Sequence, residues 1–154
     1  MMNIQILQIG ASKESALMQM EAEYEKRLKG FAKLETLTLA ASKKDERRAV
    51  QEEDLKHFLP KIDTGAFLIA LDEQGLQFSS EAFAKHIEKI RDFGEGKIQI
   101  LIGGSHGLHP ELIAQAKLRL SFSKMTFTHE MIRVFLKEQL YRAFTILAGK
   151  TYHK

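Results

Sequence analysis

Residues 97–107 read KIQILIGGSHG, an apolar run that leads into three glycines. An apolar run without polar alternation is typical of a parallel strand covered on both faces. Glycine has no Cβ, so a ligand can approach the backbone closely there, and open α/β sheets bind ligands at the carboxyl ends of their strands. The spacing of Gly103, Gly104 and Gly107 fits neither the dinucleotide fingerprint nor the P-loop. The stretch therefore predicts a ligand loop of another kind, with a purely structural turn as the alternative.

Outward from this stretch, apolar runs alternate with amphipathic segments. Strands are predicted at Asn3–Ile9, Leu34–Ala40, Ala66–Asp72, Lys97–Gly103 and Lys117–Phe122. Helices are predicted at Glu14–Lys29, Glu46–Leu59 and Ser79–Phe93, and a last helix starts after Thr128 or His129 and runs to about Ala148. Signals at the helix ends are Ser79 or Ser80 as N-caps, Pro110 at a helix start and Gly149 at a helix end. This alternation predicts an α/β fold, a mainly parallel sheet with helices on both faces.

The length and composition exclude several classes of protein. The chain has 154 residues, which fits a single domain over residues 1–154. It has no cysteine, which excludes a disulfide framework and cysteine-based zinc or thiol chemistry. Its N-terminal apolar stretch is too short for a signal peptide, and no run approaches the ~18 apolar residues of a membrane span. We therefore expect a soluble, cytoplasmic protein with no membrane partner.

The charge of the chain is uneven. Residues 117–154 carry eight Lys and Arg against two Glu, a net charge of +6, whereas residues 1–116 carry −3. A basic C-terminal quarter would attract an anionic polymer such as RNA, and the alternative is a solvated helix face. The histidines form no metal site by spacing, because His106 and His109 lack a third ligand nearby. We expect no metal.

The end of the chain holds a second group of chemically capable side chains. Glu138 and Arg142 lie four residues apart on the last predicted helix, where the simplest interpretation is an intrahelical ion pair. The chain closes with Tyr152, His153 and Lys154, which follow Gly149 and are expected to project beyond the helix. Arg, Tyr and His at a free end can hydrogen-bond to or stack on a nucleotide, and the alternative is a frayed terminus.

These motifs together resemble one family over the full length of the chain. LIGGSHGLHPEL at 101–112, LSFSKMTFTHEMIRVFLKEQLYRAF at 120–144 and the terminal YHK are similar to the SPOUT-class ribosomal RNA large subunit methyltransferase H family, which methylates N3 of a pseudouridine. EYEKRL at 23–28 and LDEQG at 71–75 add to the resemblance. One position departs, since the family usually has Pro-His where this chain has Thr128-His129. Threonine can cap a helix, so the last helix can still begin there.

The resemblance implies a fold and a cofactor that periodicity does not reveal. SPOUT enzymes tie their C-terminal segment into a trefoil knot, a rare exception to unknotted topology, and bind S-adenosylmethionine in it. The backbone of the implied cradle would hold the adenosine, and Met125 and Phe127 would form apolar walls. From the residues alone, those two side chains would be core. The full set of implied cradle residues is Leu71, Gly103, Gly104, Ser123, Lys124, Met125, Thr126, Phe127 and Thr128.

The resemblance also implies a reaction, the transfer of a methyl group to N3 of a pseudouridine in 23S rRNA within the assembled 70S ribosome. A homodimer would complete the RNA surface, since the family has little beyond the SPOUT domain. His153 is the first candidate for the general base, because its ordinary pKa of ~6.5 leaves it mostly neutral, and Glu138 is the second. Arg142 would stabilise charge on the pyrimidine carbonyls, Tyr152 would stack on the base, and Lys154 would contact RNA.

Three alternatives stay open. The tail could bind RNA while solvent takes the proton. The target could be another RNA, such as tRNA. The chain could also be a ribosome-binding protein without enzymatic activity.

Overall fold

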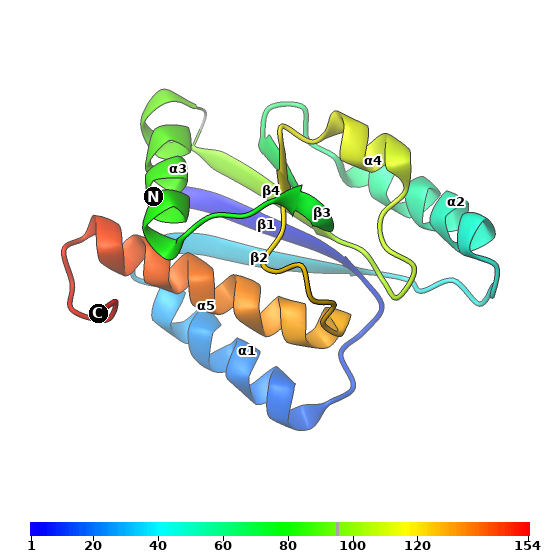
Figure 1. Ribbon diagram of the computed structural model, residues 1–154, viewed down its shortest axis with the longest axis horizontal. Coiled ribbons are helices and arrows are strands. Elements are labelled where there is room, and N and C mark those ends of the chain that lie inside the picture. Colours follow the sequence, from blue (N-terminus) through cyan, green and yellow to red (C-terminus); the bar gives the residue numbers. More distant parts are fainter. Residues whose placement is uncertain (95) are drawn as a thin grey trace.

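The computed structural model describes residues 1–94 and 96–154. Five strands and the helices between them alternate along the chain, as the sequence predicts (Figure 1). The strands are β1 (Met2–Ile9), β2 (Ala32–Leu39), β3 (Phe67–Leu76), β4 (Lys97–Ile102) and β5 (Leu118–Leu120). The helices are α1 (Ser15–Leu28), α2 (Arg47–Phe58), the short 3₁₀ helix η1 (Leu59–Lys61), α3 (Ser80–Phe93), α4 (Pro110–Gln115) and α5 (His129–Leu147).

The five strands form one sheet in the order β2-β1-β4-β3-β5, and every neighbouring pair is parallel. All five predicted strands are therefore confirmed, with shifted ends. β3 continues to Leu76 because a register shift between Leu71 and Leu76 lets both residues pair with Leu120 of β5. Gly75 permits this approach, since a Cβ there would lie 2.5 Å from the carbonyl oxygen of Arg119.

Two apolar cores cover the two faces of the sheet. Ile6 and Ile100 point to the face covered by α1, α3 and α5, and their neighbours Leu7 and Leu101 point to the face covered by α2 and α4 (Figure 1). Successive side chains of a strand alternate between faces, so a strand that is apolar at every position must be covered on both sides. Full burial of each such side chain contributes roughly 1.5–3 kcal/mol. The predicted helices on both faces are confirmed.

Local signals fix the start of α3 and both ends of α5. Ser79 caps α3, because its hydroxyl accepts a hydrogen bond from Ala82 N at 3.1 Å. Thr128 caps α5 in the same way, with Met131 N donating to its Oγ1 at 3.2 Å. Thr128 thus starts the helix without the family's usual proline. Gly149 has a positive φ of 67°, which ends α5 as the sequence predicts.

The strand order decides which connections meet. β4, β3 and β5 are neighbours and parallel, so their carboxyl ends lie side by side at one edge of the sheet. The chain leaves β5 at this edge and then begins α5, which packs with α1 and α3. A trefoil knot would require the segment between β5 and α5 to pass through the loop formed by the preceding elements. This threading stays a prediction.

Candidate functional site

The three segments that the resemblance assigns to a cofactor come together at the carboxyl edge of the sheet. Leu71 of β3 pairs with Leu120 of β5, and Gly103 directly follows β4, the neighbour of β3 on its other side. Ser121 N donates to Leu76 O at 2.8 Å, so the segment after β5 starts against β3. Three segments that are far apart in the sequence therefore lie at the carboxyl ends of the neighbouring strands β4, β3 and β5.

The glycine loop, residues 103–107, is a compact turn held by backbone contacts. Gly107 N donates to Gly104 O at 3.1 Å. A Cβ at Gly103 would lie 2.7 Å from the carbonyl carbon of Gly107, so this glycine is required by the turn itself. A Cβ at Gly104 would meet only the Ile9 side chain, at 3.5 Å, an ordinary contact. Glycine at 104 is thus not required by protein packing, and the backbone there is open to close approach.

The segment 123–128 leaves its apolar side chains open. Met125 is 74% exposed and Phe127 is 38% exposed, so the interpretation of these two as core is wrong. Phe127 is only partly covered, by an edge-to-face contact with Phe135 of α5 at a centroid distance of 5.2 Å. Thr126 Oγ1 donates to Glu73 Oε2 at 2.7 Å, and Met125 N donates to Ser123 Oγ at 3.0 Å. These bonds hold the segment beside β3 while its apolar side chains stay available to a ligand.

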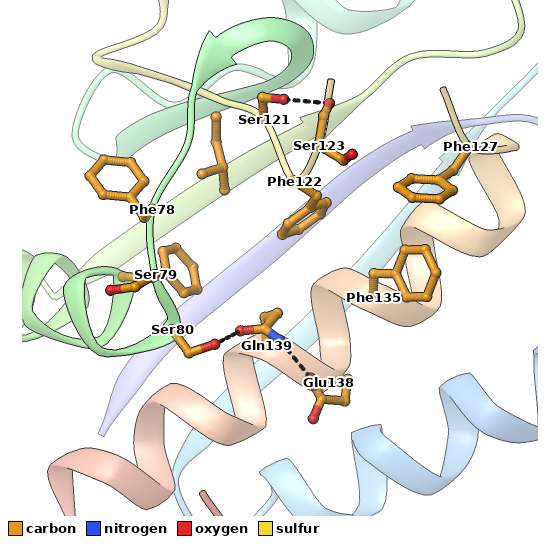
Figure 2. Close-up of a pocket in the computed structure, with 12 residues that line it drawn as sticks. Phe78, Ser79, Ser80, Ser121, Phe122, Ser123, Phe127, Phe135, Glu138 and Gln139 are labelled. Carbon is orange, nitrogen blue, oxygen red and sulfur yellow. Dashed lines mark hydrogen bonds between the residues drawn. The ribbon is translucent and has the colours of Figure 1, made fainter. Parts of the chain in front are cut away.

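A cavity of about 440 Å³ adjoins this segment (Figure 2). The segment after β5, the start of α3 and the middle of α5 form its walls, and Figure 2 shows aromatic rings on opposite sides of it. Its polar lining includes Ser123, Glu138 and Gln139, and its aromatic lining is Phe78, Phe83, Phe122, Phe127 and Phe135. Aromatic walls with a few fixed polar groups suit a planar, polar-edged ligand.

Glu138 holds a cluster of side chains at one end of this cavity. The predicted ion pair is present, because Arg142 donates from Nη2 to Glu138 Oε1 at 2.5 Å and from Nε to the same oxygen at 3.0 Å. Gln139 Nε2 donates to the other oxygen, Oε2, at 2.9 Å, and Ser80 Oγ donates to Gln139 Oε1 at 2.8 Å. The hydrogen bond to Glu138 raises the pKa of Arg142 above its ordinary value.

The terminal residues belong to the same cluster. Tyr152 Oη donates to Glu138 Oε1 at 3.1 Å, and the Arg142 guanidinium lies 4.8 Å from the centroid of the Tyr152 ring. Burial raises the pKa of Tyr152. The expectation that the tail projects beyond the last helix is therefore wrong for Tyr152 and His153, which fold back onto α5. Lys154 is exposed.

The contacts of His153 define its hydrogen-bonding state. Arg142 Nη1 lies 3.0 Å from His153 Nδ1, and His153 Nε2 lies 2.7 Å from Glu81 Oε1. A guanidinium can only donate, so Nδ1 accepts, and Nε2 carries the proton that it donates to Glu81. This hydrogen bond lowers the pKa of Glu81. Sequence reasoning missed Glu81, because 72 residues separate it from His153 and no local signal links them.

Within one chain, the predicted site residues form two groups. Gly103 and Gly104 lie at the carboxyl ends of the strands, whereas Arg142 of α5, Tyr152 and His153 form the cluster around Glu138. Glu138 links this cluster to the segment 123–128, because it lines the same cavity as Ser123 and Phe127.

Only part of the positive charge of the C-terminal quarter is free at the surface, because two of its eight cations are buried and two others form ion pairs. Arg133 is 0% exposed and donates to Ser12 Oγ and to the carbonyl oxygens of Ile9 and Gly10. Lys137 is 2% exposed and pairs with two glutamates of α1, Glu21 and Glu25. Arg119 pairs with Asp72, and Arg142 pairs with Glu138. Half of these eight cations therefore stabilise the fold or are neutralised.

The histidines and carboxylates of the described residues are dispersed rather than clustered. No group of three or more His, Cys, Asp or Glu residues there could hold a metal ion. His109 instead caps α4, since its Nδ1 accepts from Glu111 N at 3.0 Å. None of the helices described is long and apolar enough to cross a membrane.

Comparison with known proteins places this chain in a family. The family model described as "Predicted SPOUT methyltransferase" matches residues 2–153. The chain therefore belongs to the SPOUT methyltransferase family and is an enzyme, which removes the non-enzymatic alternative. A solved structure, that of a probable methylase family protein from Haemophilus influenzae Rd KW20, shares the fold with a TM-score of 0.55 and 18% identity. That likeness covers 98% of this chain and 70% of the other.

Curated relatives are similar over their whole length. The ribosomal RNA large subunit methyltransferase H of Desulfotalea psychrophila is 44% identical over 153 residues, which cover 99% of this chain and 100% of the relative. The relative of the same name from Shouchella clausii is 41% identical over 159 residues, with the same coverage. That from Bacillus cereus is 43% identical over 159 residues, again with 99% and 100% coverage.

Proposed function

We propose that this enzyme transfers a methyl group from S-adenosylmethionine to N3 of a pseudouridine in 23S rRNA, within the assembled 70S ribosome. The observation that carries the proposal is the meeting of three segments at one sheet edge, those containing Leu71, Gly103-Gly104 and Ser123–Thr128. Relatives named ribosomal RNA large subunit methyltransferase H, at 40–44% identity over the full length, support the rRNA substrate. The position and atom on the RNA follow from the family resemblance.

The residues at the carboxyl ends of β3, β4 and β5 have the chemistry to hold S-adenosylmethionine. Gly104 offers backbone that protein packing leaves open, and Met125 and Phe127 offer exposed apolar side chains for an adenine. The carboxylates of Asp72 and Glu73 lie in β3 beside this segment, where Glu73 accepts the Thr126 hydroxyl. Leu71, Ser123, Lys124 and Thr128 complete the proposed cradle. When bound, S-adenosylmethionine supplies a methyl group on a sulfonium, which is already a good leaving group.

The chain's own residues must then hold the base and remove the N3 proton. Phe78, Phe83 and Phe135 of the cavity would hold the pyrimidine, and Tyr152 would stack on it after leaving its contact with Glu138. His153 is the proposed base, but its Nδ1 lone pair is occupied by Arg142 in this arrangement. If a pyrimidine carbonyl replaces His153 as the acceptor of Arg142 Nη1, one exchange supplies the charge stabilisation and frees the base. Glu138 keeps Arg142 in place through its other two hydrogen bonds.

A second subunit would bring the two groups of residues together. Within one chain the tail cluster lies beside α5 and the glycine loop at the sheet edge, so we infer a homodimer in which α5 packs about a two-fold axis. Each tail could then serve a cradle completed by the partner. Lys154, exposed at the chain end, would contact the RNA phosphates.

Labelled S-adenosylmethionine tests the proposal. The purified enzyme is incubated with 70S ribosomes, with separated subunits and with tRNA, all from a strain that lacks the corresponding gene. Incorporation into 23S rRNA of 70S ribosomes is expected. Incorporation into tRNA alone would favour the alternative SPOUT substrate and overturn the rRNA assignment.

A further inference from the structure

The connection between β2 and α2, together with the first turn of α2, carries a cluster of exposed positive charge outside the proposed catalytic site. Lys43, Lys44, Arg47 and Arg48 are all exposed in a stretch of six residues. We propose that residues 42–48, which span the end of this connection and the first two residues of α2, bind the phosphodiester backbone of the substrate RNA next to the target nucleotide. The inference rests on the proposed function, because it takes RNA as the substrate.

Hydrogen bonds hold this connection in one shape. Ser42 Oγ donates to Glu53 Oε2 at 3.1 Å and accepts from Lys44 N at 3.1 Å. Lys44 Nζ also pairs with Glu53, at 3.4 Å. Glu46 caps α2 by accepting from Arg48 N at 3.0 Å and from Ala49 N at 2.8 Å. A connection that is already ordered loses little entropy when it binds a ligand.

Two of the four cations are available to a partner. Arg48 pairs with Glu52 at 3.1 Å, and Lys44 pairs with Glu53, so those charges are partly neutralised. Lys43 and Arg47 have no ion-pair partner among residues 1–94 and 96–154. Glu46 is used by the helix cap, which leaves Asp45 as the one acidic side chain of the connection without such a role in the described contacts. The net charge of residues 42–48 is positive.

The connection lies close to the proposed cofactor cradle. All strands are parallel, so the connection after β2 and the glycine loop after β4 lie at the same edge of the sheet (Figure 1). Gln51 Nε2 donates to His106 O of the glycine loop at 2.8 Å, which ties α2 directly to that loop. Arg47 is four residues before Gln51 on α2, so their Cβ atoms lie about 5–6 Å apart. Arg47 therefore lies about one helical turn from the residue that bonds to the glycine loop.

This placement adds to the charge that the C-terminal quarter offers. Arg133 and Lys137 are buried and Arg119 and Arg142 form ion pairs, so half of the basic C-terminal residues are already used within the fold. Phosphate contacts by Lys and Arg provide most of the sequence-independent affinity for a nucleic acid. Such contacts near the reacting base would hold the RNA while the base enters the site. Residues 42–48 provide them at the correct edge of the sheet.

The test is the salt dependence of binding to 70S ribosomes from a strain that lacks the gene. The double variant Lys43→Ala/Arg47→Ala is compared with wild type between about 50 and 200 mM salt. Loss of two phosphate contacts should lower the slope of log K against log salt by about 1.4 for single-stranded RNA. KM for ribosomes should rise while kcat at saturating ribosomes and the affinity for S-adenosylmethionine stay unchanged.

The control variant Lys56→Ala/Lys61→Ala removes the same charge from the other end of α2 and from η1. These lysines are exposed, and nine residues of helix separate Lys56 from Arg47, about 14 Å. The control should bind with the wild-type slope. An unchanged slope in the Lys43/Arg47 variant, or an equal loss in the control, would overturn the proposal. A loss of affinity for S-adenosylmethionine would also overturn it, because the cations would then serve the cofactor. If the wild-type enzyme binds ribosomes but does not methylate them, the proposed function is refuted. The RNA contact by residues 42–48 is still tested in that case, because the salt dependence measures binding and not methylation.

Discussion

Gly103 and Gly104 are adjacent, yet alanine at each position should have a different effect. At Gly103 the added Cβ would lie 2.7 Å from the Gly107 carbonyl carbon and 3.0 Å from Leu108 N, and backbone cannot move aside cheaply. Overpacking of this kind costs roughly 1–3 kcal/mol, which for a chain of this size lowers Tm by about 2–4 °C per kcal/mol. At Gly104 the Cβ would only touch Ile9 at 3.5 Å, and φ is not positive, so Tm should be unchanged or slightly higher.

The effect on the cofactor should be the reverse of the effect on the fold. If the adenosine of S-adenosylmethionine lies against the backbone at Gly104, one methyl group there should weaken binding by tenfold or more, about 1.4 kcal/mol. Scanning calorimetry measures the stability of each variant, and titration calorimetry measures the affinity for S-adenosylmethionine. Gly104→Val should weaken binding further with the fold retained. Wild-type affinity in Gly104→Ala and Gly104→Val would show that the glycine loop is not the cofactor site.

Three further predictions concern the tail, the assembly and a buried carboxylate. Deletion of residues 152–154 should leave the affinity for S-adenosylmethionine nearly unchanged and lower the rate of methyl transfer by about 10²-fold or more. His153→Ala should lower this rate more than Lys154→Ala does. Full activity after the deletion would exclude the tail from function. Light scattering at micromolar concentration should give twice the chain mass of 17.6 kDa, and an active monomer would refute the dimer. Burial raises the pKa of Asp54, whose Oδ1 has no hydrogen-bond partner among the described residues. The stability that Asp54 contributes is therefore full below its ordinary pKa and is lost as the pH rises through the raised value. Asp54→Asn should raise Tm at pH 7, with the gain shrinking toward pH 4; an equal gain at both values would contradict this sign.

The fold was predictable because its signals are local. The unbroken apolar runs before Asp72 and Gly103 demand cover on both faces of a strand, and both faces are covered. Ser79, Thr128, Pro110 and Gly149 mark helix ends through contacts within a few residues. The order of the strands was not predictable, because pairing between β1 and β4 joins residues more than ninety positions apart.

The candidate site was predictable only in part, for the same reason. The Glu138–Arg142 pair lies within one helical turn and is present as expected. The return of His153 to Glu81 depends on where α3 packs against α5, which no local pattern encodes. Arg133 looks like a surface cation in sequence, yet the carbonyl oxygens of Ile9 and Gly10 accept its hydrogen bonds in the interior. Charge counted along the sequence therefore overestimated the basic surface of the C-terminal quarter.

Mass spectrometry of 23S rRNA gives the most direct test of the proposed activity. Ribosomes from a strain without the gene are incubated with the purified enzyme, with and without S-adenosylmethionine, and the rRNA is fragmented and sequenced by mass. One methyl group on N3 of a single pseudouridine, dependent on S-adenosylmethionine and on 70S ribosomes, is the expected result. A methyl group on another atom or another nucleotide, or an unmodified 23S rRNA, would contradict it.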